Sequence, residues 1–319
     1  MEVFLMYFLF VVGLVCIIKG GDWFVDAAAW LAEVSGIPHF IVGATVVGFA
    51  TSLPEVIVSV IAAAQGDVDM ATGNAIGSVT ANTGLIMGIS LIFMPLAIKL
   101  KEYLPKILLL IVSIIAVWAF GVSGEISVIA SITLCALFAF FVYENIKSAK
   151  SQLSANNEQE EKAEITKAIV AKKIFLFVIG CAGIIVGSEL LVNYGTEIAA
   201  SLGVPTRIIS LSAVAIGTSL PELVTTISAI TKKQSSLSVG NIIGSNIIDI
   251  TFVLPPCMIA YGKNLPVSAG TIWVDLPVLF GLSAIAFVPT IITKKFMRWQ
   301  GVVLLVGYIG YLIYMFVSH

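Results

Sequence analysis

Residues 48–55 read GFATSLPE, and residues 215–222 read AIGTSLPE. The shared motif TSLPE therefore occurs twice, at a separation of 167 residues. The run GNAIGS at residues 73–78 returns as GNIIGS at residues 240–245 with the same separation. Ungapped matches at one fixed separation indicate an internal repeat, so we expect two halves of similar fold within this chain.

The composition is that of a membrane protein. Hydrophobic residues make up 59 % of the 319 residues and charged residues only 11 %, and the mean hydropathy is +1.06. A helix needs roughly 20 apolar residues to cross a bilayer, and the apolar runs here are too long and continuous for a β-barrel. We predict about ten transmembrane helices, near residues 3–18, 39–63, 70–96, 104–122, 126–146, 173–192, 206–230, 238–260, 270–292 and 300–317.

The charges predict an orientation. No basic residue precedes the first apolar run and Lys19 follows it, which favours a retained first span over a signal peptide. With the N-terminus outside, every Lys and Arg except Arg207 and Lys263 falls on the inner side. We therefore expect a multi-pass protein of the cell membrane with both termini extracytoplasmic and the central linker cytoplasmic.

The repeat and the spans together predict the architecture. Each half holds five spans, and because five is odd, the second half enters the membrane from the opposite side. The expected fold is an all-α integral membrane protein with two inverted-topology repeats of five helices. Residues 1–146 would form the first repeat, 147–172 the linker and 173–319 the second repeat. A duplicated scaffold without function is the alternative, but the repeated segments are polar and therefore costly in lipid.

Three carboxylates lie deep in apolar segments: Glu55, Glu222 and Asp249. Placing a charge at such depth costs about 2.5–3.5 kcal/mol on the insertion scale, and no Lys or Arg within the same spans offers a partner. Either these acids are protonated or cations reside beside them.

The neighbours of these acids favour cations. Thr51 and Ser52 precede Glu55 by four and three residues, so a helical path would bring the three side chains to one face. Pro54 cannot donate a backbone hydrogen bond, so we expect a kink that releases carbonyls around residues 48–50. The same pattern recurs around Pro221 in Thr218, Ser219 and Glu222, with carbonyls of residues 215–217. Carboxylate, hydroxyl and carbonyl oxygens are the ligands that Ca²⁺ and Na⁺ prefer.

The second repeated element adds a polar stripe. Asn74, Ser78 and Asn82 are spaced four residues apart, and their counterparts are Asn241, Ser245 and Asp249. An adjacent row of small residues, which allows helices to approach closely, consists of Gly73, Gly77, Gly240 and Gly244. Together the two elements predict four helices packed around an oxygen-lined site.

At these motifs the chain resembles the sodium/calcium exchanger family of the calcium/cation antiporter superfamily, in its prokaryotic type without a regulatory domain. The resemblance covers essentially the whole chain, including GGDWFV near the start and RWQG at residues 298–301. It implies that spans two, three, seven and eight form the core. Spans one and six, broken at Gly20, Gly21 and Gly187, would slide across that core.

The resemblance also implies a metal site and a transport activity. The ligands would be Gly48, Thr51, Ser52, Glu55, Ser78, Asn82, Ala215, Thr218, Ser219, Glu222, Ser245 and Asp249, with Gly48 and Ala215 acting through their carbonyls. Val79 departs from the second repeat, where Asn246 stands, and this weakens any symmetrical ligand role for Asn246. The implied function is antiport of Na⁺ for Ca²⁺, with the bilayer and the two ions as partners and neither cofactor nor nucleic acid expected.

Three alternative functions would each need sequence features that differ from those of this chain. Calcium/proton exchangers of the superfamily usually carry a glutamate inside the GNxxE element, where this chain has glycine. Potassium-dependent sodium/calcium exchange is a further alternative, disfavoured by Asn82 in place of a second aspartate. An intramembrane protease would need an aspartate pair of GxGD type, a serine with a histidine, or HExxH, and none of these is found. His39 and His319 form no cluster, and the four cysteines are far apart, so neither metal nor thiol catalysis is indicated.

Overall fold

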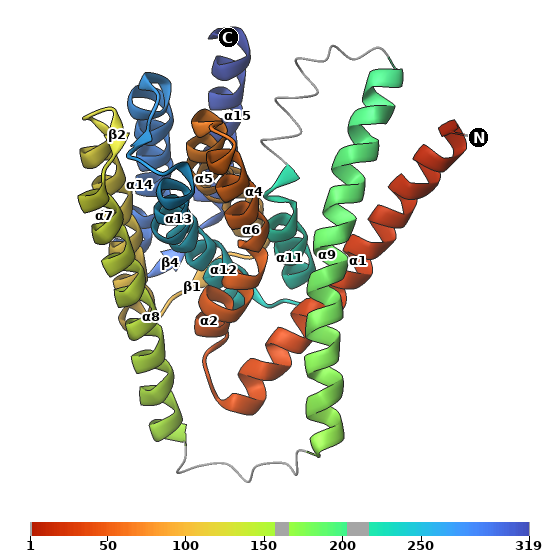
Figure 1. Cartoon of the computed structure of the whole chain (residues 1–319). Helices are drawn as coiled ribbons and strands as arrows, with labels where there is room; N and C mark the ends of the chain where they lie inside the picture. Colours follow the sequence, from red (N-terminus) through yellow and green to blue (C-terminus); the bar gives the residue numbers. More distant parts are fainter. Residues whose placement is uncertain (1, 157–165, 203–216, 319) are drawn as a thin grey trace.

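The computed structural model describes residues 2–156, 166–202 and 217–318, and nearly all of them are helical (Figure 1). The prefix η marks π-helical turns. The first half holds α1 (Glu2–Ser35), α2 (His39–Val42), η1 (Gly43–Val47), α3 (Gly48–Thr51), α4 (Leu53–Ala64), α5 (Val68–Ala81), η2 (Asn82–Ile86), α6 (Met87–Phe93), α7 (Leu100–Gly121) and α8 (Val128–Asn156). The second half holds α9 (Lys167–Ser201), α11 (Leu220–Thr231), α12 (Ser235–Ile248), η3 (Asp249–Val253), α13 (Leu254–Tyr261), η4 (Thr271–Asp275), α14 (Leu276–Thr293) and α15 (Arg298–Ser318).

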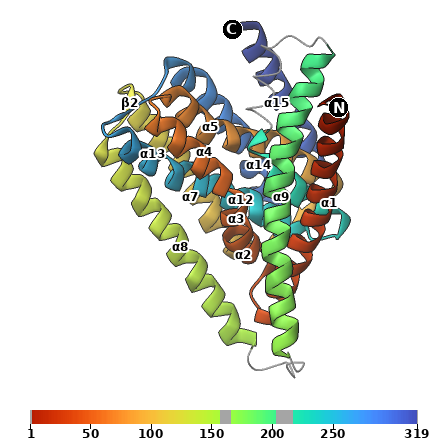
Figure 2. The ribbon, with the colours of Figure 1, turned by 45° about the vertical axis from the view of Figure 1, so that its right-hand side comes forward.

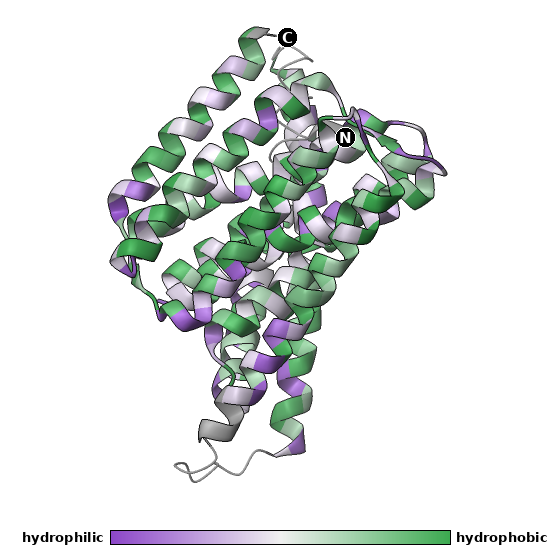
Figure 3. Cartoon of the chain, turned by 90° about the vertical axis from the view of Figure 1, so that its left-hand side faces the viewer, coloured by the Kyte–Doolittle hydropathy of each residue, from purple (hydrophilic) through white to green (hydrophobic). Residues whose placement is uncertain are grey.

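The helices form a multi-pass membrane protein. Among the described residues, eight helices are long and apolar enough to cross a bilayer, and the bent pair formed by residues 39–51 and 53–64 makes a ninth span. The remaining predicted span, 206–230, is described only from residue 217, where α11 follows. Large apolar side chains are exposed along the long helices, as at Phe8, Ile115, Ile132, Phe175 and Val306. Hydrophobic residues predominate along these helices, and many of the most hydrophilic residues lie toward helix ends and loops (Figure 3). Such a surface matches a hydrocarbon environment.

The breaks between helices follow from local sequence. Gly36 and Gly66 adopt φ values of +68° and +86°, which glycine reaches without a steric cost, and these glycines end α1 and α4. Asp67 caps α5 by accepting a hydrogen bond from the backbone N–H of Met70 at 3.1 Å. Gly262, with φ of +79°, closes α13 in the same left-handed conformation.

The core is made of the repeated elements. In the most apolar stretch of α5–α6 72 % of residues are buried, and in that of α12–α13 78 %, against 22 % in α9 and in α15. Helix α12 packs against α2, η1 and α3 of the first half, and α4 packs against α5 and α13. Helix α11, the described part of span seven, packs against α12. The predicted core of spans two, three, seven and eight is therefore present as far as these spans are described.

Two short antiparallel ribbons join the halves. Strand β1 (Leu96–Ala97) pairs with β4 (Lys295–Phe296), so that Leu96 lies opposite Phe296. Strand β2 (Glu125–Ile126) pairs with β3 (Leu265–Pro266), so that Glu125 lies opposite Pro266. In Figure 1, β2 lies near the top of the bundle, whereas β1 and β4 lie lower. Each ribbon takes one strand from each half.

The prediction of glycine breaks in the first and sixth spans is wrong. Helix α1 runs without interruption through Gly20 and Gly21 to Ser35, well beyond the predicted end at residue 18, and α9 is continuous through Gly187. The two helices cross at one side of the bundle (Figures 1 and 2).

The glycines serve packing. A Cβ atom on Gly20 would lie 2.8 Å from the Gly180 carbonyl oxygen, and one on Gly187 would lie 2.8 Å from the Gly13 carbonyl oxygen. A helical glycine costs about 1 kcal/mol relative to alanine, and here it permits backbone contact between α1 and α9.

The linker is more helical than its composition suggested. Helix α8 continues through the predicted boundary to Asn156, and α9 already begins at Lys167. Residues 147–156 and 167–172 are rich in Lys, Ala and Ser with no Pro or Gly, so the flanking helices extend into them. Residues 157–165 lie outside the described residues.

Candidate functional site

A buried polar centre lies where the repeated elements of the two halves meet. Its three carboxylates belong to Glu55 on α4, Glu222 on α11 and Asp249 on η3, and each residue is 0 % exposed. Glu55 lies close enough to Glu222 and Asp249 for the three charges to repel one another. The structure therefore brings together the acids that the sequence places far apart.

A sharp bend places Glu55 at a helix start. The axes of residues 39–51 and 53–64 differ by 40°, and Ser52, with φ −80° and ψ −3°, forms the joint. Pro54 stands at the start of α4, and Glu55 lies in its first turn. The N-terminal end of a helix carries partial positive charge, so this position favours a carboxylate.

The second repeat has the same geometry. Ser219, with φ −87° and ψ 5°, precedes α11, whose first turn contains Pro221 and Glu222. Thus the glutamate of each TSLPE motif lies in the first turn of a helix that begins within the motif. Ala215, the predicted carbonyl ligand of this repeat, lies outside the described residues.

The predicted release of carbonyls is not seen at Gly48. The Gly48 carbonyl oxygen accepts the backbone N–H of Ser52 at 3.0 Å, and it lies 3.3 Å from Thr51 Oγ1 and 3.4 Å from Ser245 Oγ. The proline frees the carbonyl four residues before it, at Ala50, because Pro54 has no N–H. Cys181 Sγ approaches that carbonyl oxygen at 4.0 Å.

Hydroxyl groups of the two halves meet in two equivalent pairs. Thr51 Oγ1 lies 3.2 Å from Ser245 Oγ, and Thr218 Oγ1 lies 3.3 Å from Ser78 Oγ. Each pair joins a TSLPE threonine of one half to a GNxxGS serine of the other. The sequence predicted both members as ligands, and their pairing follows from the inverted packing of the halves.

A third contact between the halves joins Asn82 and Asp249, which occupy equivalent positions in the two repeats. Asn82 Nδ2 donates a hydrogen bond to Asp249 Oδ2 at 3.5 Å, and both residues are fully buried. Asn82 begins the π-helical turn η2, and Asp249 begins η3. Single π-helical turns inside α-helices often occur at functional sites, because they redirect side chains and backbone groups.

Many oxygens of this centre have no hydrogen-bond partner. Within the described part of the chain this holds for the carboxylate oxygens of Glu55 and Glu222, for Asp249 Oδ1, and for the hydroxyls of Ser52 and Ser219. Thr51 and Ser245 do approach the Glu222 carboxylate, although not at normal hydrogen-bond geometry. None of the ion pairs found among the described residues involves the three acids.

The donor set fits hard cations. A buried acceptor without a donor costs about 1–3 kcal/mol, more for a charged group, unless a cation or proton offsets it. No three His, Cys, Asp or Glu side chains among the described residues come close enough to hold a metal ion by themselves. A cation here would need hydroxyl, amide or carbonyl oxygens beside the carboxylates, as Na⁺ and Ca²⁺ sites commonly use.

Comparison with known proteins agrees with this chemistry. The sequence model of the family described as sodium/calcium exchanger protein matches residues 5–147 and 172–317. The chain belongs to the sodium/calcium exchanger protein family. The match covers both repeats and leaves out the region between them.

Relatives and solved structures support this membership. The sodium/calcium exchanger MaX1 of Methanosarcina acetivorans is 29 % identical over 97 % of this chain and 98 % of its own length. The inner membrane protein YrbG of Escherichia coli is 35 % identical over 82 % of each chain. A structure of the sodium-calcium exchanger NCX_Mj superposes with a TM-score of 0.84 at 31 % identity, over 98 % of this chain and 99 % of that one.

Sequence reasoning placed Asn74 and Asn241 in the polar stripe without a role at the site. Asn74 Nδ2 donates to Ser59 Oγ at 2.9 Å and to the Glu55 carbonyl oxygen at 3.4 Å. Asn241 Oδ1 accepts from Thr51 Oγ1 at 3.2 Å. The signal that could have found these contacts in this exchanger-family chain was the repeated Gly-Asn pair, since a buried amide needs partners.

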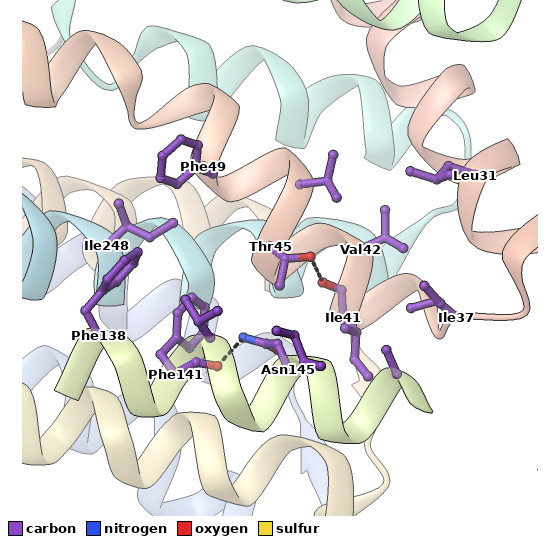
Figure 4. Close-up of a pocket in the computed structure, with 14 residues that line it drawn as sticks. Leu31, Ile37, Ile41, Val42, Thr45, Phe49, Phe138, Phe141, Asn145 and Ile248 are labelled. Atoms are coloured by element: carbon purple, nitrogen blue, oxygen red, sulfur yellow. Dashed lines mark hydrogen bonds between the residues drawn. The ribbon is translucent and has the colours of Figure 1, made fainter. Parts of the chain in front are cut away.

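A separate pocket of about 390 Å³ lies between α8 and the helix path α2–η1–α3 (Figure 4). Its lining is almost wholly apolar, and several lining side chains, such as Phe49, are more than a third exposed toward the lipid side. Its two polar residues bond to their own helices: Thr45 Oγ1 donates to the Ile41 carbonyl at 2.7 Å and Asn145 Nδ2 to the Phe141 carbonyl at 2.9 Å. The oxygens a cation needs are therefore gathered at the polar centre and not in this pocket.

Proposed function

We propose that this protein is a secondary active antiporter that exchanges Na⁺ for Ca²⁺ across the cell membrane by alternating access. The observation that carries the proposal is a pair of fully buried glutamates, Glu55 and Glu222, whose carboxylate oxygens lack hydrogen bonds among the described residues. Membership of the sodium/calcium exchanger protein family supports the choice of ions. The protein would act as a transporter and not as an enzyme.

The ion ligands are proposed to come equally from both halves. They are Thr51, Ser52, Glu55, Ser78 and Asn82, then Thr218, Ser219, Glu222, Ser245 and Asp249, with the carbonyls of Gly48 and Ala215. Inverted repeats supply a site near the membrane midplane, because equivalent segments cross there from opposite sides. Binding Na⁺ or Ca²⁺ offsets the cost of burying the three carboxylates.

The direction of transport follows from the charges. The distribution of Lys and Arg favours termini outside and the central linker, residues 147–172, inside. With three ionised carboxylates the site carries −3, which three Na⁺ neutralise and one Ca²⁺ leaves at −1. A cycle of three Na⁺ against one Ca²⁺ would move one positive charge inward with sodium and would export calcium at a negative-inside potential.

Alternating access is proposed to use α1 and α9. These helices pack on each other through backbone contacts at glycines and are among the least buried of the long helices. The close backbone contact at these glycines holds the two helices together, so that they can move as a unit against the core. This motion would uncover the polar centre on one side at a time.

The deciding experiment is calcium uptake into proteoliposomes with an imposed sodium gradient. Uptake that requires internal sodium, and that fails when potassium or choline replaces it, is the expected result. Uptake driven equally by a proton gradient without sodium would overturn the choice of counter-ion.

Potassium-dependent sodium/calcium exchange is the second candidate. The human sodium/potassium/calcium exchanger 1 is 29 % identical to this chain, over 34 % of the chain and 10 % of its own length. If potassium were co-transported, uptake in sodium-loaded vesicles would require external potassium. Calcium/proton antiport remains a further alternative, and the sodium-free arm of the same assay tests it.

A further inference from the structure

The side chain of Asn241 on α12 contacts both hydroxyls of the pair Thr51 and Ser245. Thr51 Oγ1 donates to Asn241 Oδ1 at 3.2 Å, and Ser245 Oγ lies 3.4 Å from the same oxygen. Asn241 is 0 % exposed, and its Nδ2 has no hydrogen-bond partner in the described part of the chain. In this structure the amide therefore acts only as an acceptor.

The repeat explains which way the amide points. Asn74, the equivalent residue of the first half, donates from Nδ2 to the backbone carbonyl oxygen of Glu55 and to Ser59 Oγ. A carbonyl oxygen can only accept, so the nitrogen must face the TSLPE helix of its own half. The same orientation at Asn241 turns Oδ1 toward Thr51 and Ser245.

A hydroxyl that coordinates a cation must direct its one proton elsewhere, because its lone pairs face the ion. The acceptors near Thr51 and Ser245 are the Gly48 carbonyl, the Glu222 carboxylate, the other hydroxyl of the pair, and Asn241 Oδ1. The first three belong to the proposed ligand set and would themselves face the ion. Among the described residues, Asn241 Oδ1 is the acceptor in this group that lies outside that set.

We propose that Asn241 is a positioning residue for ion binding: its amide oxygen takes the hydroxyl protons of Thr51 and Ser245 and thereby turns their lone pairs toward the transported cation. The inference rests on the proposed function and adds a residue to it. Asn241 does not contact the ion; it acts through the two hydroxyls. Its loss weakens cation binding while the charged ligands stay in place.

The test compares side chains of similar size with and without the acceptor oxygen. Asn241→Leu removes the oxygen, whereas Asn241→Asp keeps an acceptor oxygen and replaces the amide nitrogen, which makes no hydrogen bond here, with the second oxygen of an ionisable carboxyl group. Asn246→Leu is the matched control, since Asn246 is equally buried on α12 and donates to Thr83 Oγ1 at 2.9 Å, away from the hydroxyl pair. Asn241→Ala replaces the Leu variant if that variant does not fold.

Binding is read as the rise in melting temperature of the purified full chain in detergent during titration with CaCl₂ or NaCl, because a ligand of the native state stabilises it. We expect Asn241→Leu to raise the half-maximal Ca²⁺ concentration at least about tenfold. Asn241→Asp is expected to raise it by no more than about threefold, because the acceptor oxygen is kept and an added negative charge favours cation binding. Asn246→Leu lowers the ion-free melting temperature but leaves the half-maximal concentration unchanged. A purely structural role for Asn241 would move only the ion-free melting temperature.

Three possible results separate the inference from the proposed function. A wild-type protein stabilised by Ca²⁺, with an Asn241→Leu variant that binds Ca²⁺ equally well, would overturn the inference alone. The same holds if Asn241→Asp binds as weakly as Asn241→Leu, since the oxygen would then be irrelevant. A wild-type protein that neither cation stabilises would contradict the proposed function and the inference with it.

Discussion

Asn82 and Asp249 occupy equivalent positions, 167 residues apart, and meet across the interface between the halves with Nδ2 and Oδ2 at 3.5 Å. Each begins a π-helical turn, so the backbone keeps the symmetry of the repeat at this point. The side chains break that symmetry, because one is an amide and the other a carboxylate. An odd number of acids results, and with it an odd site charge when all three are ionised.

The first prediction concerns this odd charge. Calcium flux through the wild-type protein is expected to depend on voltage, since three Na⁺ and one Ca²⁺ leave the site with different net charge. Asp249→Asn changes the site charge from −3 to −2, which either two Na⁺ or one Ca²⁺ neutralises. Any remaining exchange is therefore expected to be indifferent to voltage. The measurement uses calcium-loaded proteoliposomes with a sodium gradient and a potential clamped by potassium and valinomycin. A wild-type flux equal at inside-negative and inside-positive potentials would rule out electrogenic exchange.

The second prediction concerns the two glutamates. Glu55→Gln and Glu222→Gln each remove a charged ligand from a buried site, and each is expected to weaken Ca²⁺ binding by about tenfold to a hundredfold, about 1.4–2.8 kcal/mol. Calcium uptake at low external calcium is then lost. Glu33→Gln, at an exposed position on α1, is the control and is expected to transport normally. Full calcium transport by Glu55→Gln would refute the site assignment.

The third prediction tests the seam between α1 and α9, that is, the close backbone contacts at Gly13, Gly20, Gly180 and Gly187. A Cβ atom on Gly180 would lie 2.7 Å from the backbone nitrogen of Phe24, so Gly180→Ala must push the helices apart. Such overpacking costs about 1–3 kcal/mol, and slower exchange is expected because the pair no longer moves as one unit. Gly310→Ala on α15, where a Cβ meets nothing within 4 Å, is the matched control. Equal exchange rates for the two variants would show that the seam plays no part in transport.

The fourth prediction concerns the ion pairs that tie α1 to the end of α11. Lys232 Nζ lies 2.7 Å from Asp26 Oδ1 and 3.7 Å from Asp22 Oδ1, and its side chain is 24 % exposed. Partly exposed pairs contribute at most about 1 kcal/mol, so Lys232→Gln is expected to change the exchange rate by up to about fivefold, with ion affinity unchanged.

A double-mutant cycle with Asp26→Asn measures how much the Lys232–Asp26 ion pair contributes to the exchange rate. If Lys232 acts through Asp26, the double variant Lys232→Gln with Asp26→Asn has the same rate as either single variant. If the fold-changes of the two single variants instead multiply in the double variant, the pair does not couple α1 to α11.

Much of the site could be predicted before any fold was known. Glu55, Glu222 and Asp249 are conspicuous because carboxylates in apolar segments are costly, and the TSLPE spacing places hydroxyls one helical turn from each glutamate. The prolines after Ser52 and Ser219 predicted the breaks, and the structure confirms a 40° bend at the first of them. The glycines of α1 and α9 were misread, since a glycine in a helix permits either a break or a close helix contact and the neighbouring helix decides which.

The sequence by itself determined the membrane environment, the number of repeats and the residue types of the polar centre, because composition, periodicity and spacing are properties of the chain alone. Only the tertiary structure decided which oxygens meet. Thr51 faces Ser245 and Asn241, residues 194 and 190 positions away, and Ser78 faces Thr218. Such contacts depend on how two inverted halves pack, and a hydrogen bond requires placement to within a few tenths of an ångström, which no spacing along the chain specifies.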